Sequence, residues 1–171
     1  MLGDIVGRII DFIIELKGFV VIRCYERGVR FRNGRVTEGQ LVPGVFFYVP
    51  LLWSIEVVPI VEDVIDLPTQ SITTADGKMV SFSANISFTV EDAVLLYTEV
   101  QDFGENLSRV ACGHLAMRVR EWSWEELQSS QRKLESSLRD TLTTRVKGWG
   151  VRILECRLTD CVQAKQIRLV P

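Results

Sequence analysis

The sequence is poor in the side chains that most metal and redox sites require. It contains one histidine and four cysteines, Cys24, Cys112, Cys156 and Cys161, and no two of these cysteines have the C-x-x-C spacing of zinc ligands. No cleavable signal peptide precedes them, so we expect reduced and mostly buried thiols rather than disulfides. The sequence therefore predicts neither a metal site nor a disulfide framework.

An excess of positive charge is also absent. The chain has 20 lysines and arginines against 22 aspartates and glutamates, which gives a formal net charge of −2. Proteins that bind nucleic acid usually carry a strongly basic face. Because no basic stripe with interleaved aromatic residues is present, we expect no nucleic-acid partner.

Catalytic motifs are missing as well. The chain contains no G-x-S-x-G, no phosphate-binding glycine loop and no H-E-x-x-H. The nearest candidate for a nucleophile with its base is Cys112 with His114, but residues two apart on a helix point in nearly opposite directions. The sequence therefore predicts a protein that is not an enzyme and that uses no cofactor.

The sequence does contain an amphipathic segment at its start. At about 100° per residue, the apolar side chains of residues 2–17 fill an arc of roughly 200°, wider than the stripe of an ordinary surface helix. Five charged residues interrupt the segment, whereas a membrane span needs about 20 mostly uncharged residues. We interpret residues 1–17 as a membrane-associating helix that lies in the plane of a bilayer surface. The alternatives are packing onto a sister subunit or a partner protein, and folding back onto its own domain. The predicted membrane-binding residues are Leu2, Ile5, Val6, Ile9, Ile10, Phe12, Ile13, Ile14 and Leu16.

Residues 18–90 have the pattern of a β-rich half. Asn33-Gly34 and Asp76-Gly77 are hairpin turn signals. The alternation of apolar and polar residues over 80–90 predicts a half-buried strand, and the apolar run 45–49, which Pro50 ends, predicts a buried one. Further strands are predicted over 18–25, 52–60, 61–67 and 70–75.

Residues 91–168 mix helices with a strand. The pattern predicts a short helix over 91–97 and a longer one over 105–121. Ser123 with Glu126 forms a capping box, which predicts a further helix from about 124 to 147. A final strand is predicted over 151–158. The fold class is therefore α+β, with a β-rich first half packed against a mixed second half.

A series of motifs in this order resembles the stomatin/prohibitin/flotillin family, whose shared unit is the SPFH or band 7 domain. The resemblance starts with a Glu-Arg-x₆-Gly-Arg run and a Pro-Gly-x-x-Phe-x-x-Pro run. It continues through residues 73–78, 117–118, 124–127 and 149–151 to Asp160. The residues of the two runs are Glu26, Arg27, Gly34 and Arg35, then Pro43, Gly44, Phe47 and Pro50.

The resemblance implies a membrane-associated scaffold without enzymatic activity. Such proteins sit on a membrane as peripheral or monotopic proteins, here on the cytoplasmic face, and assemble side by side with copies of themselves. They organise lipid and regulate neighbouring membrane proteins such as proteases and channels. The expected partners are thus a lipid bilayer, the protein itself and a membrane protease or channel. The alternative is a soluble adapter or regulatory module whose N-terminal helix docks on a protein partner.

Two further features are left open by the residues alone. His114, Arg118 and Trp122 are candidates for a contact between subunits; alternatively His114 and Trp122 are core or boundary residues and Arg118 bridges to a carboxylate. Because relatives of stomatin can be acylated on cysteine, the resemblance also offers acylation of Cys24 as the alternative to a free thiol.

Overall fold

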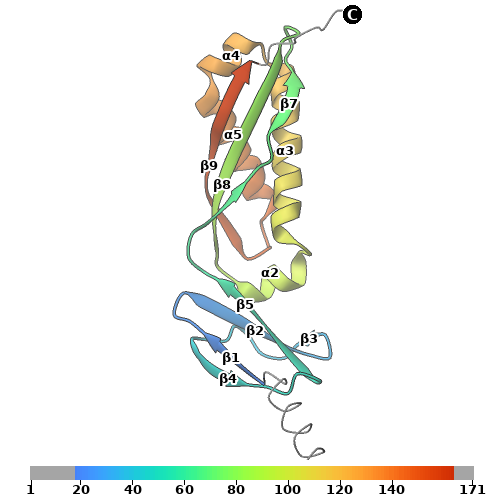
Figure 1. The fold of residues 1–171 in the computed structure, drawn as a ribbon, viewed down its shortest axis with the longest axis vertical. Coiled ribbons are helices and arrows are strands. Elements are labelled where there is room, and N and C mark those ends of the chain that lie inside the picture. Colours follow the sequence, from blue (N-terminus) through green and yellow to red (C-terminus); the bar gives the residue numbers. More distant parts are fainter. Residues whose placement is uncertain (1–17, 164–171) are drawn as a thin grey trace, which may run out of the picture. The chain divides into compact units, whose positions relative to one another are not determined.

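The computed structural model describes residues 18–163, which form two compact units. The first unit comprises residues 18–61 with 92–94, and the second comprises 62–91 with 95–163 (Figure 1). The sequence pattern changes after residue 90, whereas the two units divide after Val61, because the strands of residues 62–90 form the sheet that the later helices cover.

In the first unit, a three-stranded antiparallel sheet has the order β3-β2-β5. Strand β2 (Glu26–Arg32) turns into β3 (Arg35–Val36) through Asn33 and Gly34, whose φ angles are 50° and 75°. These two positive values are what a type I′ hairpin requires, so the predicted turn is confirmed. Strand β5 (Trp53–Pro59) pairs with the other edge of β2.

A second, two-stranded sheet completes this unit. Strand β1 (Phe19–Ile22) pairs antiparallel with β4 (Gly44–Phe47). A bridge between Gly28 and Leu41 connects β2 to the segment before β4. Ile22, Val29 and Leu41 are buried and form the core of the unit.

In the second unit, the long strand β8 (Met79–Val90) is the centre of the sheet. Strands β6 (Asp63–Asp66) and β7 (Gln70–Thr73) pair with one edge of β8, and β9 (Val151–Gln163) pairs with the other. The predicted alternation over 80–90 is confirmed, because every second residue is buried. The predicted Asp76-Gly77 turn joins β7 to β8, with Gly77 at a φ of 79°.

Strand β9 is longer than the predicted 151–158, and its alternation is interrupted. Its register against β8 shifts twice, so Leu154 and Thr159 have no direct partner. The first of these bulges reverses the side to which the following residues point. As a result Cys156, rather than Glu155, is buried on the same side as Val151 and Ile153.

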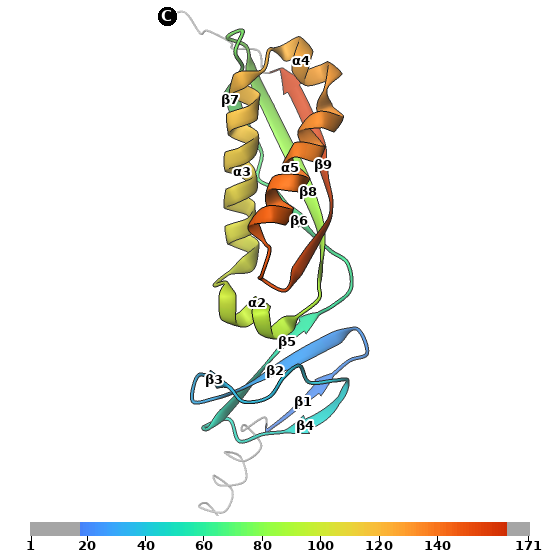
Figure 2. The same ribbon diagram turned by 180° about the vertical axis from the view of Figure 1, so that it is seen from behind.

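Helices cover the buried face of this sheet (Figures 1 and 2). The short helix α2 (Ala93–Glu99) follows β8. Helix α3 (Phe103–Glu121) has Asp102 as its N-cap and begins at Phe103, two residues before the predicted start at 105. Helix α3 packs against β6 and β7, and α5 (Gln131–Arg145) packs against β9 and α3. The buried helical residues that meet the sheet and each other are Leu107, Ala111, Cys112, Leu115, Val119, Leu134, Leu138 and Leu142.

The single helix predicted over 124–147 is wrong, because the chain forms two helices there. The capping box at Ser123 and Glu126 is present and starts α4 (Trp124–Ser129). Ser130, with φ −120° and ψ 23°, then interrupts the helix before α5. Serine side chains compete for backbone hydrogen bonds, and the apolar stripe skips one turn between Leu127 and Leu134. Ser130 thus lies where the apolar stripe is interrupted.

Candidate functional site

The sheet formed by β1 and β4 buries one face and leaves large apolar side chains on the other. Phe19 lies opposite Phe47 in the pairing, and Val21 lies opposite Val45. Directly opposite residues of antiparallel strands point to the same side, and the Phe19 and Phe47 ring centroids are 6.4 Å apart. Phe47 is 78% exposed and the other three are more than half exposed. Four bulky apolar side chains thus share one uncovered face.

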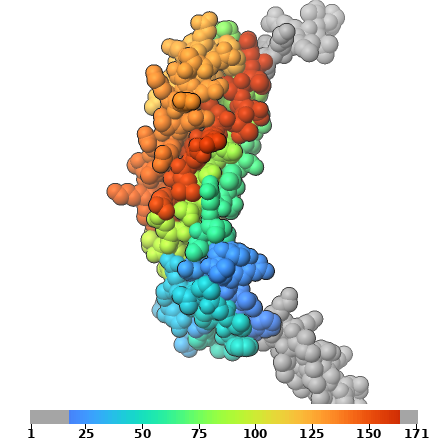
Figure 3. Space-filling view, turned by 90° about the vertical axis from the view of Figure 1, so that its left-hand side faces the viewer, coloured from blue at the N-terminus to red at the C-terminus, as the bar shows by residue number. Residues whose placement is uncertain are grey.

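The exposed apolar character continues into the loop between β4 and β5. Leu51 in this loop is 89% exposed, more than any other large apolar residue of residues 18–163. We define the apolar surface as the seven exposed residues of β1, β4 and this loop, which belong to the blue and cyan part of the surface in Figure 3. They are Phe19, Val21, Val45, Phe47, Val49, Leu51 and Leu52.

The apolar surface corrects the sequence-based interpretation of residues 45–49 as a buried strand. Among residues 18–163, strand β4 pairs with β1 alone. Only Phe46 and Tyr48 of this run are partly covered, while Val45, Phe47 and Val49 are exposed. A continuous apolar run is compatible with burial on both faces, but the run cannot show whether anything covers the second face.

Arginines lie beside the apolar surface in the same unit. The Arg30 guanidinium lies over the ring of Trp53, 4.9 Å from its centroid, and its Nη1 is 3.3 Å from the Glu38 carboxylate. The Arg32 guanidinium lies 5.9 Å from the same Trp53 ring. Such cation–π contacts hold the guanidinium groups against the sheet. The Arg30 Nε is buried and has no hydrogen-bond partner among the described residues.

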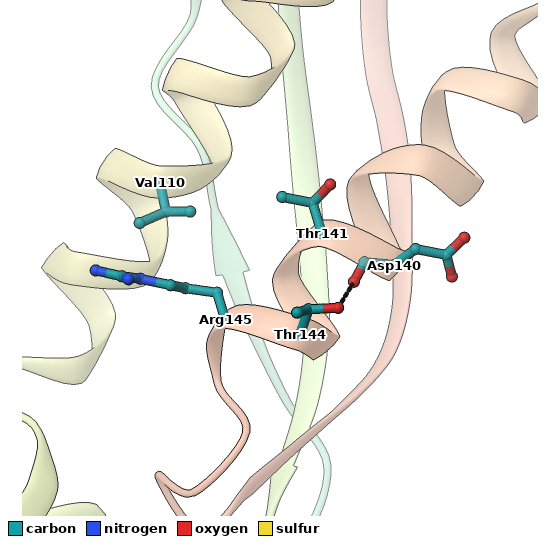
Figure 4. Close-up of a pocket in the computed structure, with 5 residues that line it drawn as sticks. All are labelled: Val110, Asp140, Thr141, Thr144 and Arg145. Atoms are coloured by element: carbon teal, nitrogen blue, oxygen red, sulfur yellow. Dashed lines mark hydrogen bonds between the residues drawn. The ribbon is translucent and has the colours of Figure 1, made fainter.

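One hollow in the second unit lies between α3 and α5 (Figure 4). Its volume is about 570 Å³, and it is lined by Val110, Asp140, Thr141, Thr144 and Arg145. The Thr144 hydroxyl donates to the Asp140 carbonyl at 2.9 Å, a bond within the helix itself. These five residues include no cysteine or histidine, and the Thr144 hydroxyl is bonded to a backbone carbonyl rather than to a side-chain base.

His114 lies between helices. Its Nε2 is 3.2 Å from the Ser137 hydroxyl of α5, and the side chain is half-buried. Burial, with the nearby Arg118 charge, lowers the pKa of His114 below its usual value, so the ring is neutral at pH 7. Cys112 is buried on α3, and burial raises its pKa, which leaves it as an inert thiol.

The other two candidate contact residues lie at the end of α3. The Arg118 guanidinium pairs with the Glu121 carboxylate at 3.0 Å on the exposed side of the helix. Trp122 is the C-cap, half-buried, and its carbonyl accepts from the backbone N–H of Ala75. The predicted role of His114, Arg118 and Trp122 in a subunit contact stays a prediction.

The predicted membrane-binding residues, from Leu2 to Leu16, lie outside the described range of 18–163. Within that range, no helix is both long enough and apolar enough to cross a bilayer. The same residues contain no group of three or more histidine, cysteine or acidic side chains arranged to hold a metal ion. Of the four cysteines, Cys24 alone is exposed, in the turn between β1 and β2.

Fold and surface together define an α+β domain in which one β unit carries an exposed apolar sheet and a second unit packs helices on an antiparallel sheet. The chain belongs to the SPFH domain / Band 7 family, whose model matches residues 20–168.

Three relatives illustrate this membership. The chain is 29% identical over 140 residues to a stomatin homolog of Pyrococcus horikoshii, covering 82% of this chain and 52% of that protein. It is 28% identical over 166 residues to an uncharacterized protein of Archaeoglobus fulgidus, covering 96% and 66%. It is 27% identical over 165 residues to Stomatin-4 of Caenorhabditis elegans, covering 94% and 57%. The chain thus spans between about half and two thirds of the length of these relatives.

Proposed function

We propose that this protein is a non-enzymatic scaffold that attaches to a bilayer, assembles there with copies of itself, and organises lipid or regulates neighbouring membrane proteins such as proteases. The apolar surface of the first unit is the observation that carries the proposal. Soluble monomers rarely expose a contiguous apolar patch of this kind unless the patch is an interaction site. Membership of the Band 7 family adds support, since stomatin homologs are among the relatives.

The chemistry of the surface suits the interfacial region of a bilayer. Phe47 and Leu51 are almost fully exposed in the protein. Burying one such side chain in an apolar medium is worth about 1.5–3 kcal/mol. Two of them therefore contribute roughly 3–6 kcal/mol, reduced by incomplete immersion. The predicted helix over 1–17 would add a second attachment of the same apolar kind.

Vesicle flotation tests the attachment. We expect the parent protein to float with neutral phosphatidylcholine vesicles. The double variant Phe47→Asp, Leu51→Asp should bind these vesicles at least about 100-fold more weakly, because each substitution removes an apolar contact and immerses a carboxylate. The matched control is Met117→Asp with Val162→Asp, which adds two carboxylates at exposed apolar positions of α3 and β9. This control should float like the parent.

A second variant addresses the N-terminal segment. Ile9→Asp with Ile13→Asp places two carboxylates in the middle of the predicted apolar arc and should weaken flotation while the domain stays folded. Salt should release little protein from neutral vesicles, because the attachment is apolar. If the parent does not float at all, the membrane scaffold is wrong and the soluble adapter takes its place.

The self-assembly part of the proposal needs its own measurement. We expect the molar mass of the protein in lipid nanodiscs or detergent to be that of a homo-oligomer. A strict monomer in both media at high concentration would contradict it. The variant Arg118→Glu, which reverses the charge at a candidate contact on α3, should then lower the oligomeric fraction if α3 lies in the interface.

A further inference from the structure

The hairpin of β2 and β3 brings two arginines directly opposite each other. Arg32 and Arg35 form the pair that closes the Asn33-Gly34 turn, and both side chains are exposed. Neither has a carboxylate partner among the described residues, whereas Arg30 on the same strand is paired with Glu38. Like charges directly opposite each other in a sheet destabilise the pair. Two unneutralised guanidinium groups at this position are therefore suited to an anion that lies between them.

The closing pair lies beside a hollow that touches the apolar surface. The hollow has a volume of about 200 Å³ and lies between the Asn33-Gly34 turn and the loop from Pro50 to Ser54. The Asn33 N–H donates to the Leu52 carbonyl at 3.3 Å, which fixes the turn and the loop side by side (Figure 2). Leu51 and Leu52, both members of the apolar surface, line this hollow. Arg32 and Arg35 flank the two turn residues that line the hollow, so the cationic pair adjoins a hollow whose other side is formed by Leu51 and Leu52.

The charge of this unit is local. The chain as a whole carries a formal net charge of −2, so its overall field does not favour an anionic surface. Residues 18–61 contain five arginines and three glutamates, a net charge of +2, and no lysine. Arginine binds phosphate oxygens through two parallel N–H donors, a geometry that lysine does not offer.

We propose that Arg32 and Arg35, with the adjoining hollow, bind the phosphate of an anionic phospholipid whose acyl chains continue along Leu51 and Leu52. The inference rests on the proposed membrane attachment and adds a lipid preference to it. A phosphate in a phosphatidylcholine headgroup carries a neighbouring quaternary ammonium that opposes the two guanidinium groups. The phosphate of phosphatidylglycerol has no such cation beside it and is the better ligand.

The test compares vesicles of phosphatidylcholine alone with vesicles that also contain phosphatidylglycerol. A basic residue at an anionic membrane surface strengthens binding by roughly fivefold, so two should give the parent a preference of about 10- to 30-fold for the anionic vesicles. The variant Arg32→Gln with Arg35→Gln should lose this preference and keep the parent's affinity for neutral vesicles. The matched control is Arg120→Gln with Arg132→Gln, which removes the same charge from exposed positions of α3 and α5. It should keep the preference.

Each other outcome has a distinct meaning. Equal binding of the parent to both vesicles would overturn the lipid preference while leaving the membrane attachment intact, and binding to neither would remove both proposals. If the Arg120→Gln, Arg132→Gln control loses the preference for anionic vesicles to the same extent, the preference depends on total charge alone, and the proposed site is wrong. Binding of inorganic phosphate to the parent but not to the Arg32→Gln, Arg35→Gln variant, together with equal binding of the parent to both kinds of vesicle, would assign the site to free phosphate instead of lipid.

Thermal unfolding without lipid separates binding from a structural role. Because the two arginines repel each other, their replacement should leave the unfolding temperature unchanged or raise it. A lowered unfolding temperature together with weaker binding to both kinds of vesicle would mean that the pair supports the hairpin, and the lipid site would be rejected.

Discussion

The substitution Gly28→Ala tests how closely β1 and β2 pack beneath the apolar surface. A Cβ at residue 28 would lie 2.5 Å from the Ile22 Cδ1 and 3.4 Å from atoms of Ile55 and Leu41. The backbone cannot easily withdraw, because Gly28 and Leu41 exchange two hydrogen bonds of 3.2 and 2.7 Å. Ile22 would have to move instead, and it is only 2% exposed.

The expected loss follows from two opposed effects. Overpacking a core by one methyl group costs about 1–3 kcal/mol. Alanine in place of glycine in a strand returns about 0.5–1 kcal/mol of backbone entropy. We therefore expect Gly28→Ala to lower the free energy of unfolding of the first unit by about 1–2 kcal/mol.

A second substitution should partly rescue the first. Ile22→Val removes the Cδ1 atom that the new methyl group meets, and alone it should cost about 0.5–1.5 kcal/mol. The double variant Gly28→Ala with Ile22→Val should lose less than the sum of the two single losses, by about 1 kcal/mol. Additive losses would show that the contact between these two residues is not the cause.

Hydrogen exchange during urea titration, read on peptides from residues 18–61, is the appropriate assay, because the two units need not unfold together. The control is Gly113→Ala on α3, where an added Cβ meets nothing within 4 Å. In a helix this change should stabilise by about 0.5–1 kcal/mol. If Gly28→Ala is as stable as the parent, the packing argument for the first unit is refuted.

Three further predictions concern titratable groups. A hydrogen bond from Thr74 and the neighbouring Lys78 lower the pKa of Asp76 to about 2. The stability that the ionised Asp76 contributes is therefore present above its unfolded pKa and is lost as the pH falls toward 2. The variant Asp76→Asn should flatten that part of an acid-unfolding curve. Burial lowers the pKa of His114, so the single histidine should titrate below its usual value by NMR, and stability should fall as the pH drops through the unfolded pKa near 6.5. Exposed Cys24 should react with a maleimide before the other three thiols. Cys156 should react last, because burial raises the pKa of Cys156 to about 12. Faster labelling of Cys156 would contradict its position in the core.

The sequence alone determined the local features of this chain, such as its turns and helix caps. Asn33-Gly34 requires two positive φ angles, which few other pairs supply, and the hairpin is where the pair predicts it. The alternation over 80–90 and the capping box at Ser123 each have one structural interpretation, and both are present. The order of these local motifs was also enough to identify the family, which the match over residues 20–168 confirms.

Other features depended on contacts between distant segments. Bulges opposite β8 decided that Cys156 is buried, and a break at Ser130 divided the predicted helix in two. Neither is visible in periodicity, because periodicity shows which residues share a face but not what packs against it.

The candidate site shows the same division most clearly. The sequence placed the membrane-binding residues in the segment 1–17 alone and treated residues 45–49 as buried. Only the tertiary structure showed that β4 has a single partner strand among the described residues, which leaves Phe47 exposed. It also showed that the turn between Arg32 and Arg35 lies beside the loop of Leu51. The two arginines are 16 and 19 residues before Leu51 in the chain. Their proximity is a result of strand pairing, which joins segments by backbone hydrogen bonds that no local pattern specifies.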